Sequence, residues 1–132
     1  MDLSKYSLED VILTAIRGEM SSQLVYTITA GKVENAFLKD KLAFLAVEEA
    51  KHREFLENLY VRTFPDKDMV VPEETPVPMP EMKVYEENVK LSEVLESAME
   101  AENAAKVFYY EMSKLFDNEP DIKRNLLLYK NQ

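Results

Sequence analysis

Residues 38–59 read LKDKLAFLAVEEAKHREFLENL, and this stretch decides the fold class. Its apolar residues recur in steps of four and three, a spacing that keeps one face of an α-helix turned inward. These residues form a row along the inward face of the helix, and its apolar members are Leu38, Leu42, Leu45, Leu56 and Leu59. Glu49 and His52 occupy the same row, three positions apart, so an acid and an imidazole project to the same side. The stretch therefore predicts a long helix with a polar pair on its buried face.

Similar rows occur elsewhere in the chain and predict four helical segments. We expect these at about 8–30, 34–63, 92–116 and 121–132. Ser7 followed by Asp10 fits a capping pair for the first helix, because a hydroxyl accepts from a free amide and an acid suits the positive helix end. Gly31 is expected to end or bend that helix, and Pro65 to stop the second.

The second half of the chain has its own end signals. Ser92 is a plausible cap for the third helix, and Pro120 suits the first turn of the fourth. On the fourth segment Ile122, Leu126 and Tyr129 share one face. At most about three turns fit before Gln132, so the fourth helix is expected to be short.

A proline-rich connection separates the two halves. Five prolines fall from Pro65 to Pro80 inclusive, and this composition predicts that residues 66–88 form an extended, stiff segment and not a helix. A connection this long allows the flanking helices to run parallel. A linker between two separate helical hairpins fits this segment equally well.

The two halves also carry an internal repeat. The segments Glu19 to Tyr26 and Glu102 to Tyr109 align without a gap. Each has a small residue three positions after the Glu and a Tyr seven positions after it. This repeat favours two helix-pair halves related by a pseudo-twofold axis.

The repeat predicts where a further acid would fall. Tyr26 precedes Glu49 by 23 positions, and the same step from Tyr109 reaches Gln132. The counterpart of Glu49 is therefore expected at or near Gln132, and that of His52 about three residues further on.

Carboxylates inside apolar rows indicate a metal site. A buried charge is costly unless it is paired or bound to a metal, and Glu19, Glu49 and Glu102 each lie on the inward face of a different helix. With His52, the only histidine, they form an oxygen and nitrogen donor set that suits iron or manganese. The alternative is a set of buried acid pairs, with His52 hydrogen-bonded to Glu19 or Glu102.

Composition bounds the class of protein. The 132 residues suit one domain, expected to span 1–132 with helical halves at 7–64 and 91–132 and a crossover at 65–90. The formal net charge of −9 makes nucleic acid an improbable partner. There is no cysteine, which excludes disulfides, thiolate metal sites and a cysteine nucleophile. Because the sequence has no signal peptide pattern and no long apolar run, we expect a cytoplasmic protein without membrane spans.

Taken together, these residues resemble the rubrerythrin-like branch of the ferritin-like superfamily. The resemblance covers most of the chain and rests on Glu19 with Tyr26, Glu49 with His52, and Glu102 with Tyr109. It implies an all-α, ferritin-like four-helix bundle with a long crossover between helices 2 and 3 and a shortened fourth helix.

The resemblance also implies roles for these side chains at a di-iron site. Glu19 would be a terminal ligand, Glu49 a bridging ligand and His52 a nitrogen ligand. Glu102 would be the carboxylate from the third helix, with Tyr26 and Tyr109 behind the ligands. Members of the family reduce peroxide or dioxygen, or store and oxidise iron, so the expected activity is that of a peroxidase or ferroxidase. Manganese or zinc are alternatives to iron.

Two departures from the family pattern keep a second hypothesis open. Neither the Glu nor the His of a complete fourth helix is present, and no rubredoxin-like cysteine motif is available to relay electrons. The alternative is a non-catalytic helical module whose acids form buried pairs. In either case we expect a homodimer, and the long crossover permits exchange of half-bundles between two copies.

Overall fold

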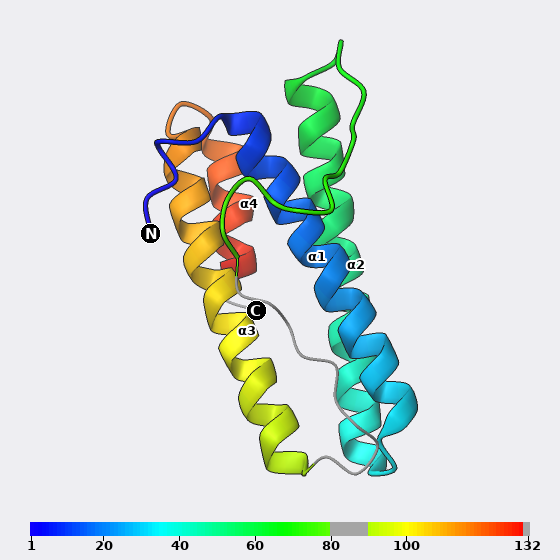
Figure 1. Cartoon of the computed structure of the whole chain (residues 1–132). Coiled ribbons are helices and arrows are strands. Elements are labelled where there is room, and N and C mark those ends of the chain that lie inside the picture. Colours follow the sequence, from blue (N-terminus) through cyan, green and yellow to red (C-terminus); the bar gives the residue numbers. More distant parts are fainter. Residues whose placement is uncertain (80–89, 131–132) are drawn as a thin grey trace.

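The structure, a computed structural model, describes residues 1–79 and 90–130, and all regular secondary structure in this part of the chain is helical (Figure 1). The elements are α1 (Leu8–Lys32), α2 (Ala36–Thr63), α3 (Leu91–Ser113), the 3₁₀ turn η1 (Lys114–Phe116) and α4 (Pro120–Lys130). This confirms the prediction of an all-α fold with four helices. The expectations for Pro80, for the rest of the crossover to residue 89, for the side chain of Tyr129 and for Gln132 lie outside the described residues.

The helices form two hairpins that lie side by side. Figure 1 shows α2 and α3 running in the same direction, with α1 and α4 running in the opposite direction. The chain after α2 turns back over the bundle, as the interpretation of the proline-rich segment as a crossover requires. Backbones approach closely within each hairpin and only sparsely between them. Side chains therefore mediate most of the contact between α1 and α3.

Helix α1 begins where the sequence predicts and ends slightly later. The hydroxyl of Ser7 accepts from the amide of Asp10 at 3.1 Å, which confirms the capping pair. The prediction that Gly31 ends the helix is wrong, since the helix continues to Lys32 and the amide of Val33 still bonds to the carbonyl of Thr29. Gly31 has no positive φ angle, so its backbone does not break the helix.

Helix α3 differs from the prediction at both ends. Ser92 is not the cap, because Lys90 takes that position without a side-chain hydrogen bond and Ser92 lies inside the first turn. Val94, in the first turn, is buried against the other hairpin. At the other end the α-helix stops at Ser113, and the last turn tightens into η1 while Phe116 remains buried.

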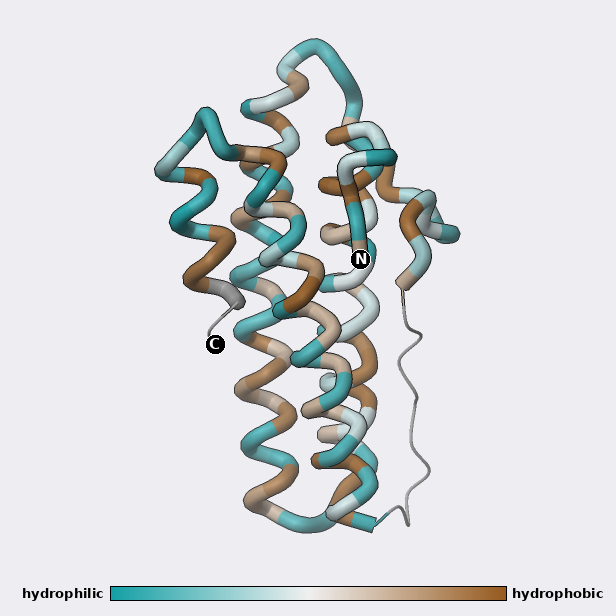
Figure 2. Tube along the Cα trace, turned by 90° about the vertical axis from the view of Figure 1, so that its left-hand side faces the viewer, coloured by the Kyte–Doolittle hydropathy of each residue, from teal (hydrophilic) through white to brown (hydrophobic). Residues whose placement is uncertain are grey.

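The core divides into two apolar clusters along the bundle. The larger one draws residues from all four helices, and the smaller one joins the end of α1, the start of α2 and the start of α3. Figure 2 shows the underlying pattern, in which hydrophobic and hydrophilic residues alternate in short runs along each helix. The inward Glu and His positions lie between the two clusters. No helix of the described part is long and apolar enough to cross a membrane.

Side-chain contacts hold the first part of the crossover against α1. Arg17 donates through Nε to the carbonyl of Pro72 at 2.7 Å and through Nη2 to that of Val71 at 3.2 Å. Further along, Val77 is buried in the larger cluster. The crossover therefore forms part of the folded body up to at least residue 79.

Candidate metal centre

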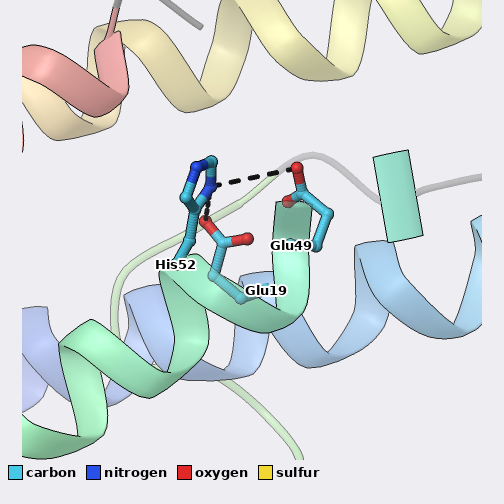
Figure 3. A group of neighbouring side chains, drawn as sticks. All are labelled: Glu19, Glu49 and His52. Atoms are coloured by element: carbon cyan, nitrogen blue, oxygen red, sulfur yellow. Dashed lines mark ion pairs between the residues drawn. The ribbon is translucent and has the colours of Figure 1, made fainter. Parts of the chain in front are cut away.

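Three of the predicted ligands meet in the middle of the bundle. Glu19 comes from α1, and Glu49 and His52 come from successive turns of α2 (Figure 3). One donor atom of each lies within 4.8 Å of the others. The three side chains are only 4%, 4% and 5% exposed, in that order. Such a group at the centre of a small bundle is the arrangement that the four-three spacing predicts.

The distances from His52 to the two acids suit a shared cation better than direct pairing of the imidazole with either acid. The Nδ1 atom of His52 lies 3.7 Å from Oε1 of Glu19 and 4.0 Å from Oε1 of Glu49. Both separations exceed a hydrogen bond. Donor atoms that bind one ion at about 2.1 Å each lie at most about 4.2 Å apart, and both distances fall within that limit.

Two tyrosines connect the hairpins at this level. The hydroxyl of Tyr26 on α1 donates to Oε1 of Glu102 on α3 at 3.0 Å. The hydroxyl of Tyr109 on α3 donates to Oε1 of Glu19 on α1. Each tyrosine of the repeat therefore bonds to the glutamate of the other half, which agrees with the pseudo-twofold relation inferred from the sequence. The ring of Tyr109 also meets that of His52 edge to face, with centroids 6.1 Å apart.

The electrostatics of the two buried acids favour a proton or a cation between them. Burial raises the pKa of Glu49 to about 10, and the hydrogen bond and charge of Glu19 add to that effect. Burial also raises the pKa of Glu19, although its hydrogen bonds to Glu49 and Tyr109 oppose the rise. The second oxygen of Glu19, Oε2, is buried and has no hydrogen-bond partner among the described residues. An unpaired buried oxygen beside a carboxylate and an imidazole fits a divalent cation.

The fourth predicted ligand, Glu102, lies on the facing helix and outside this close group. It is half-buried and fixed by Tyr26, and its charge contributes to the raised pKa values of Glu19 and Glu49. Its role as a ligand stays a prediction.

Arg17 and Arg53, the arginines nearest to Glu19 and His52 in the sequence, are engaged elsewhere. Arg17 binds the crossover carbonyls, and Nε of Arg53 pairs with Glu57 at 2.6 Å. The acid group is therefore not neutralised by either of them.

Comparison with known proteins identifies the family. The model of the family described as Rubrerythrin matches residues 10–126. The chain belongs to the Rubrerythrin family. Family membership and the helical architecture together confirm the ferritin-like fold, and the buried Glu–Glu–His group fits di-iron binding.

A solved structure supports the same fold. A hypothetical protein from Pyrococcus furiosus shares 29% sequence identity with the chain and superposes with a TM-score of 0.79. The match covers 99% of this chain and 87% of that one. The comparison with curated proteins finds no match.

The sequence did not single out Thr29, a buried polar residue further along α1. Thr29 is 1% exposed, and its hydroxyl has no hydrogen-bond partner among the described residues. It follows Tyr26 by three positions, so the same four-three spacing that marks Glu19 extends to it. This spacing is the feature of the sequence from which Thr29 could have been identified.

Proposed function

We propose that this protein binds iron at Glu19, Glu49 and His52 and uses it to reduce peroxide or dioxygen, or to oxidise Fe(II). Glu102 is the carboxylate that we expect to contribute from α3. The observation that carries the proposal is the buried group of two acids and one imidazole, with an unpaired oxygen on Glu19, in a chain of the Rubrerythrin family. With Glu102 from the facing helix, this donor set would hold iron in the manner of the di-iron carboxylate bundles.

The residues of the chain have distinct roles in this proposal. Bound iron would supply the electron transfer that side chains alone lack. Tyr109 orients Glu19, and Tyr26 orients Glu102, each through a hydrogen bond across the hairpins. The raised pKa of Glu49 lets this side chain keep a proton at neutral pH, and Glu49 would have to give up that proton to hold a cation. Apolar clusters cover the group on two sides along the bundle.

The test is single-turnover oxidation of iron under controlled conditions. The chain is loaded with Fe(II) without oxygen, hydrogen peroxide or dioxygen is added, and the ferric absorbance is followed over time. We expect fast oxidation in the natural sequence and loss of the fast phase in the double variant Glu49→Gln, His52→Leu. The matched control is Glu48→Gln, the same change one position away and outside the group.

The outcome also separates the two hypotheses. A structural acid pair would lose stability on substitution without any change in iron oxidation. Oxidation at the same rate in the double variant and in the Glu48→Gln control would refute the proposed function.

A further inference from the structure

The two acids of the metal centre are buried, so a cation from solution needs a route to them. Glu19 and Glu49 are each 4% exposed, and both line a cavity of about 810 Å³ that lies between α1 and α3. Exposed residues also line this cavity, among them Glu73, Glu74 and Glu100. A water molecule takes about 30 Å³ of liquid, so a divalent cation with six waters needs about 180 Å³. The cavity therefore joins the buried acids to the surface and has room for a hydrated cation.

The wall of this cavity is far more acidic than the chain as a whole. Its described residues include five carboxylates and one guanidinium, whereas the chain has 25 acidic and 16 basic residues. The guanidinium belongs to Arg17, which donates to two carbonyls of the crossover. A cleft lined by charges of one sign concentrates ions of the opposite sign. The wall therefore favours cations over anions.

The three exposed acids of the wall are not neutralised by neighbouring side chains. Glu73, Glu74 and Glu100 form no ion pair with any described residue. Glu48, by contrast, lies outside the wall and pairs with Lys51 at 3.2 Å. The charge of the three wall acids is therefore available to attract a cation from solution.

Contacts on both sides hold the two crossover acids at the cavity. Before them, the crossover passes over α1, where Arg17 donates to the carbonyls of Val71 at 3.2 Å and Pro72 at 2.7 Å (Figure 1). After them, the hydroxyl of Thr75 donates to the carbonyl of Val77 at 2.8 Å, and the side chain of Val77 is 1% exposed. The fold therefore places this pair of charges at the cavity.

From the buried acids at the inner end, the acidic wall and the unpaired acids at the exposed end, we infer that this cavity is the route by which a divalent cation reaches Glu19 and Glu49. Glu73, Glu74 and Glu100 attract the cation to the opening. They are not ligands, since no metal-binding group of the described residues contains them. The inference rests on the proposed function, because the route supplies the iron centre with its metal.

The test measures how fast iron associates with the chain. Fe(II) is mixed with the metal-free chain without oxygen, and tyrosine fluorescence is followed by stopped flow. The chain has seven tyrosines and no tryptophan, and Tyr109 donates to Glu19, so binding at the centre changes this signal. In the triple variant Glu73→Gln, Glu74→Gln, Glu100→Gln we expect the association rate constant to fall by about tenfold at about 0.01 M salt. The iron content at saturation is expected to equal that of the natural chain.

The matched control separates the charge of the opening from the net charge of the chain. It carries Glu34→Gln, Glu54→Gln and Glu119→Gln, the same change of charge at three exposed acids outside the wall. We expect this control to associate with Fe(II) at close to the natural rate. At about 1 M salt, where charges are screened beyond about 3 Å, the rates of the natural chain and of both triple variants are expected to converge.

The possible results distinguish this inference from the proposed function. Normal iron content with equal association rates in the two triple variants would overturn the inference alone. A difference between these variants that is as large at about 1 M salt as at about 0.01 M salt would also overturn it, because attraction between charges is screened at high salt. A natural chain that takes up no iron would overturn both the inference and the proposed function.

Discussion

Glu19 and Glu49 face each other from adjacent helices, and this pairing sets the chemistry of the centre. Two carboxyl groups that are both buried cannot both carry a full charge without a proton or a cation nearby. Burial, as the largest cause, raises the pKa of each acid. The raised pKa values, which favour a metal ion at this site, therefore also make the stability of the metal-free chain depend on pH.

The first prediction concerns that sensitivity. The pKa of Glu49 rises from 4.5 to about 10 in the fold, so between these values the folded chain holds a proton that the unfolded chain has lost. Its contribution to stability is fully present below the unfolded pKa and is lost as pH rises toward the folded one. We expect the melting temperature of the metal-free chain to fall more between about pH 5.5 and about pH 8.5 than that of Glu49→Gln. Equal falls in the two proteins would contradict the raised pKa.

A second prediction concerns the tyrosine behind Glu19. Tyr109→Phe removes the hydroxyl that donates to Glu19, and loss of such an orienting group typically weakens metal binding by about tenfold to a hundredfold. We expect iron affinity to fall by about tenfold in a chelator competition titration. The control Tyr110→Phe changes the neighbouring, exposed ring and is expected to bind iron as tightly as the natural sequence. Unchanged affinity in Tyr109→Phe would rule out an orienting role.

The sequence identified the buried acids, the histidine and the two tyrosines, but not the hydrogen bonds between them. Glu19, Glu49 and His52 were identifiable because each interrupts an apolar row at an inward position. The repeat paired Glu19 with Tyr26 along one helix, whereas in the fold Tyr26 bonds to Glu102 on the other hairpin. Spacing along a helix fixes which face a side chain occupies, but the facing helix decides which group it meets.

At the scale of the helix, a cap residue marks the start correctly where its side chain can accept a hydrogen bond from a backbone amide. Ser7 caps α1 as expected, and Asn35, not predicted, caps α2 by accepting from the amide of Leu38 at 2.9 Å. Ser92 is not a cap, because α3 begins one residue before it and Lys90 takes the cap position without a side-chain hydrogen bond. A cap residue is therefore a reliable end signal only where its side chain accepts from a free amide, as Ser7 and Asn35 do.

The third prediction measures the Asn35 cap. Asn35→Ala removes the acceptor for one free amide at the start of α2 and is expected to lower the free energy of unfolding by about 1 kcal/mol. Asn35→Asp keeps an acceptor oxygen and is expected to retain most of the stability. Chemical denaturation of the three proteins provides the measurement. A loss in Asn35→Asp as large as that in Asn35→Ala would show that the cap does not act through this oxygen.

At the scale of the whole molecule, the crossover determines how the hairpins meet. Proline spacing predicted an extended segment, and the parallel course of α2 and α3 agrees with it (Figure 1). The sequence left open whether the segment was a free linker. The decisive contacts are those of Arg17 with the carbonyls of Val71 and Pro72, and backbone acceptors leave no mark in the sequence.

The fourth prediction tests this attachment. Arg17→Met keeps an apolar stem but removes both donors to the crossover. We expect trypsin to cleave after Lys67 faster than in the natural chain, because release from α1 exposes the connection. Arg62→Met, at an exposed position near the end of α2, is the control. Equal cleavage rates at Lys67, followed by mass spectrometry, would show that other contacts hold the crossover.

The central claim is that iron binds at Glu19, Glu49 and His52, and iron content measures it most directly. The natural chain, the double variant Glu49→Gln, His52→Leu and the control Glu48→Gln are loaded with Fe(II) without oxygen, desalted and analysed for iron per chain. We predict about one to about two irons in the natural chain and in the control, and none above background in the double variant. An iron-free natural chain, or a double variant that retains as much iron as the control, would contradict the account.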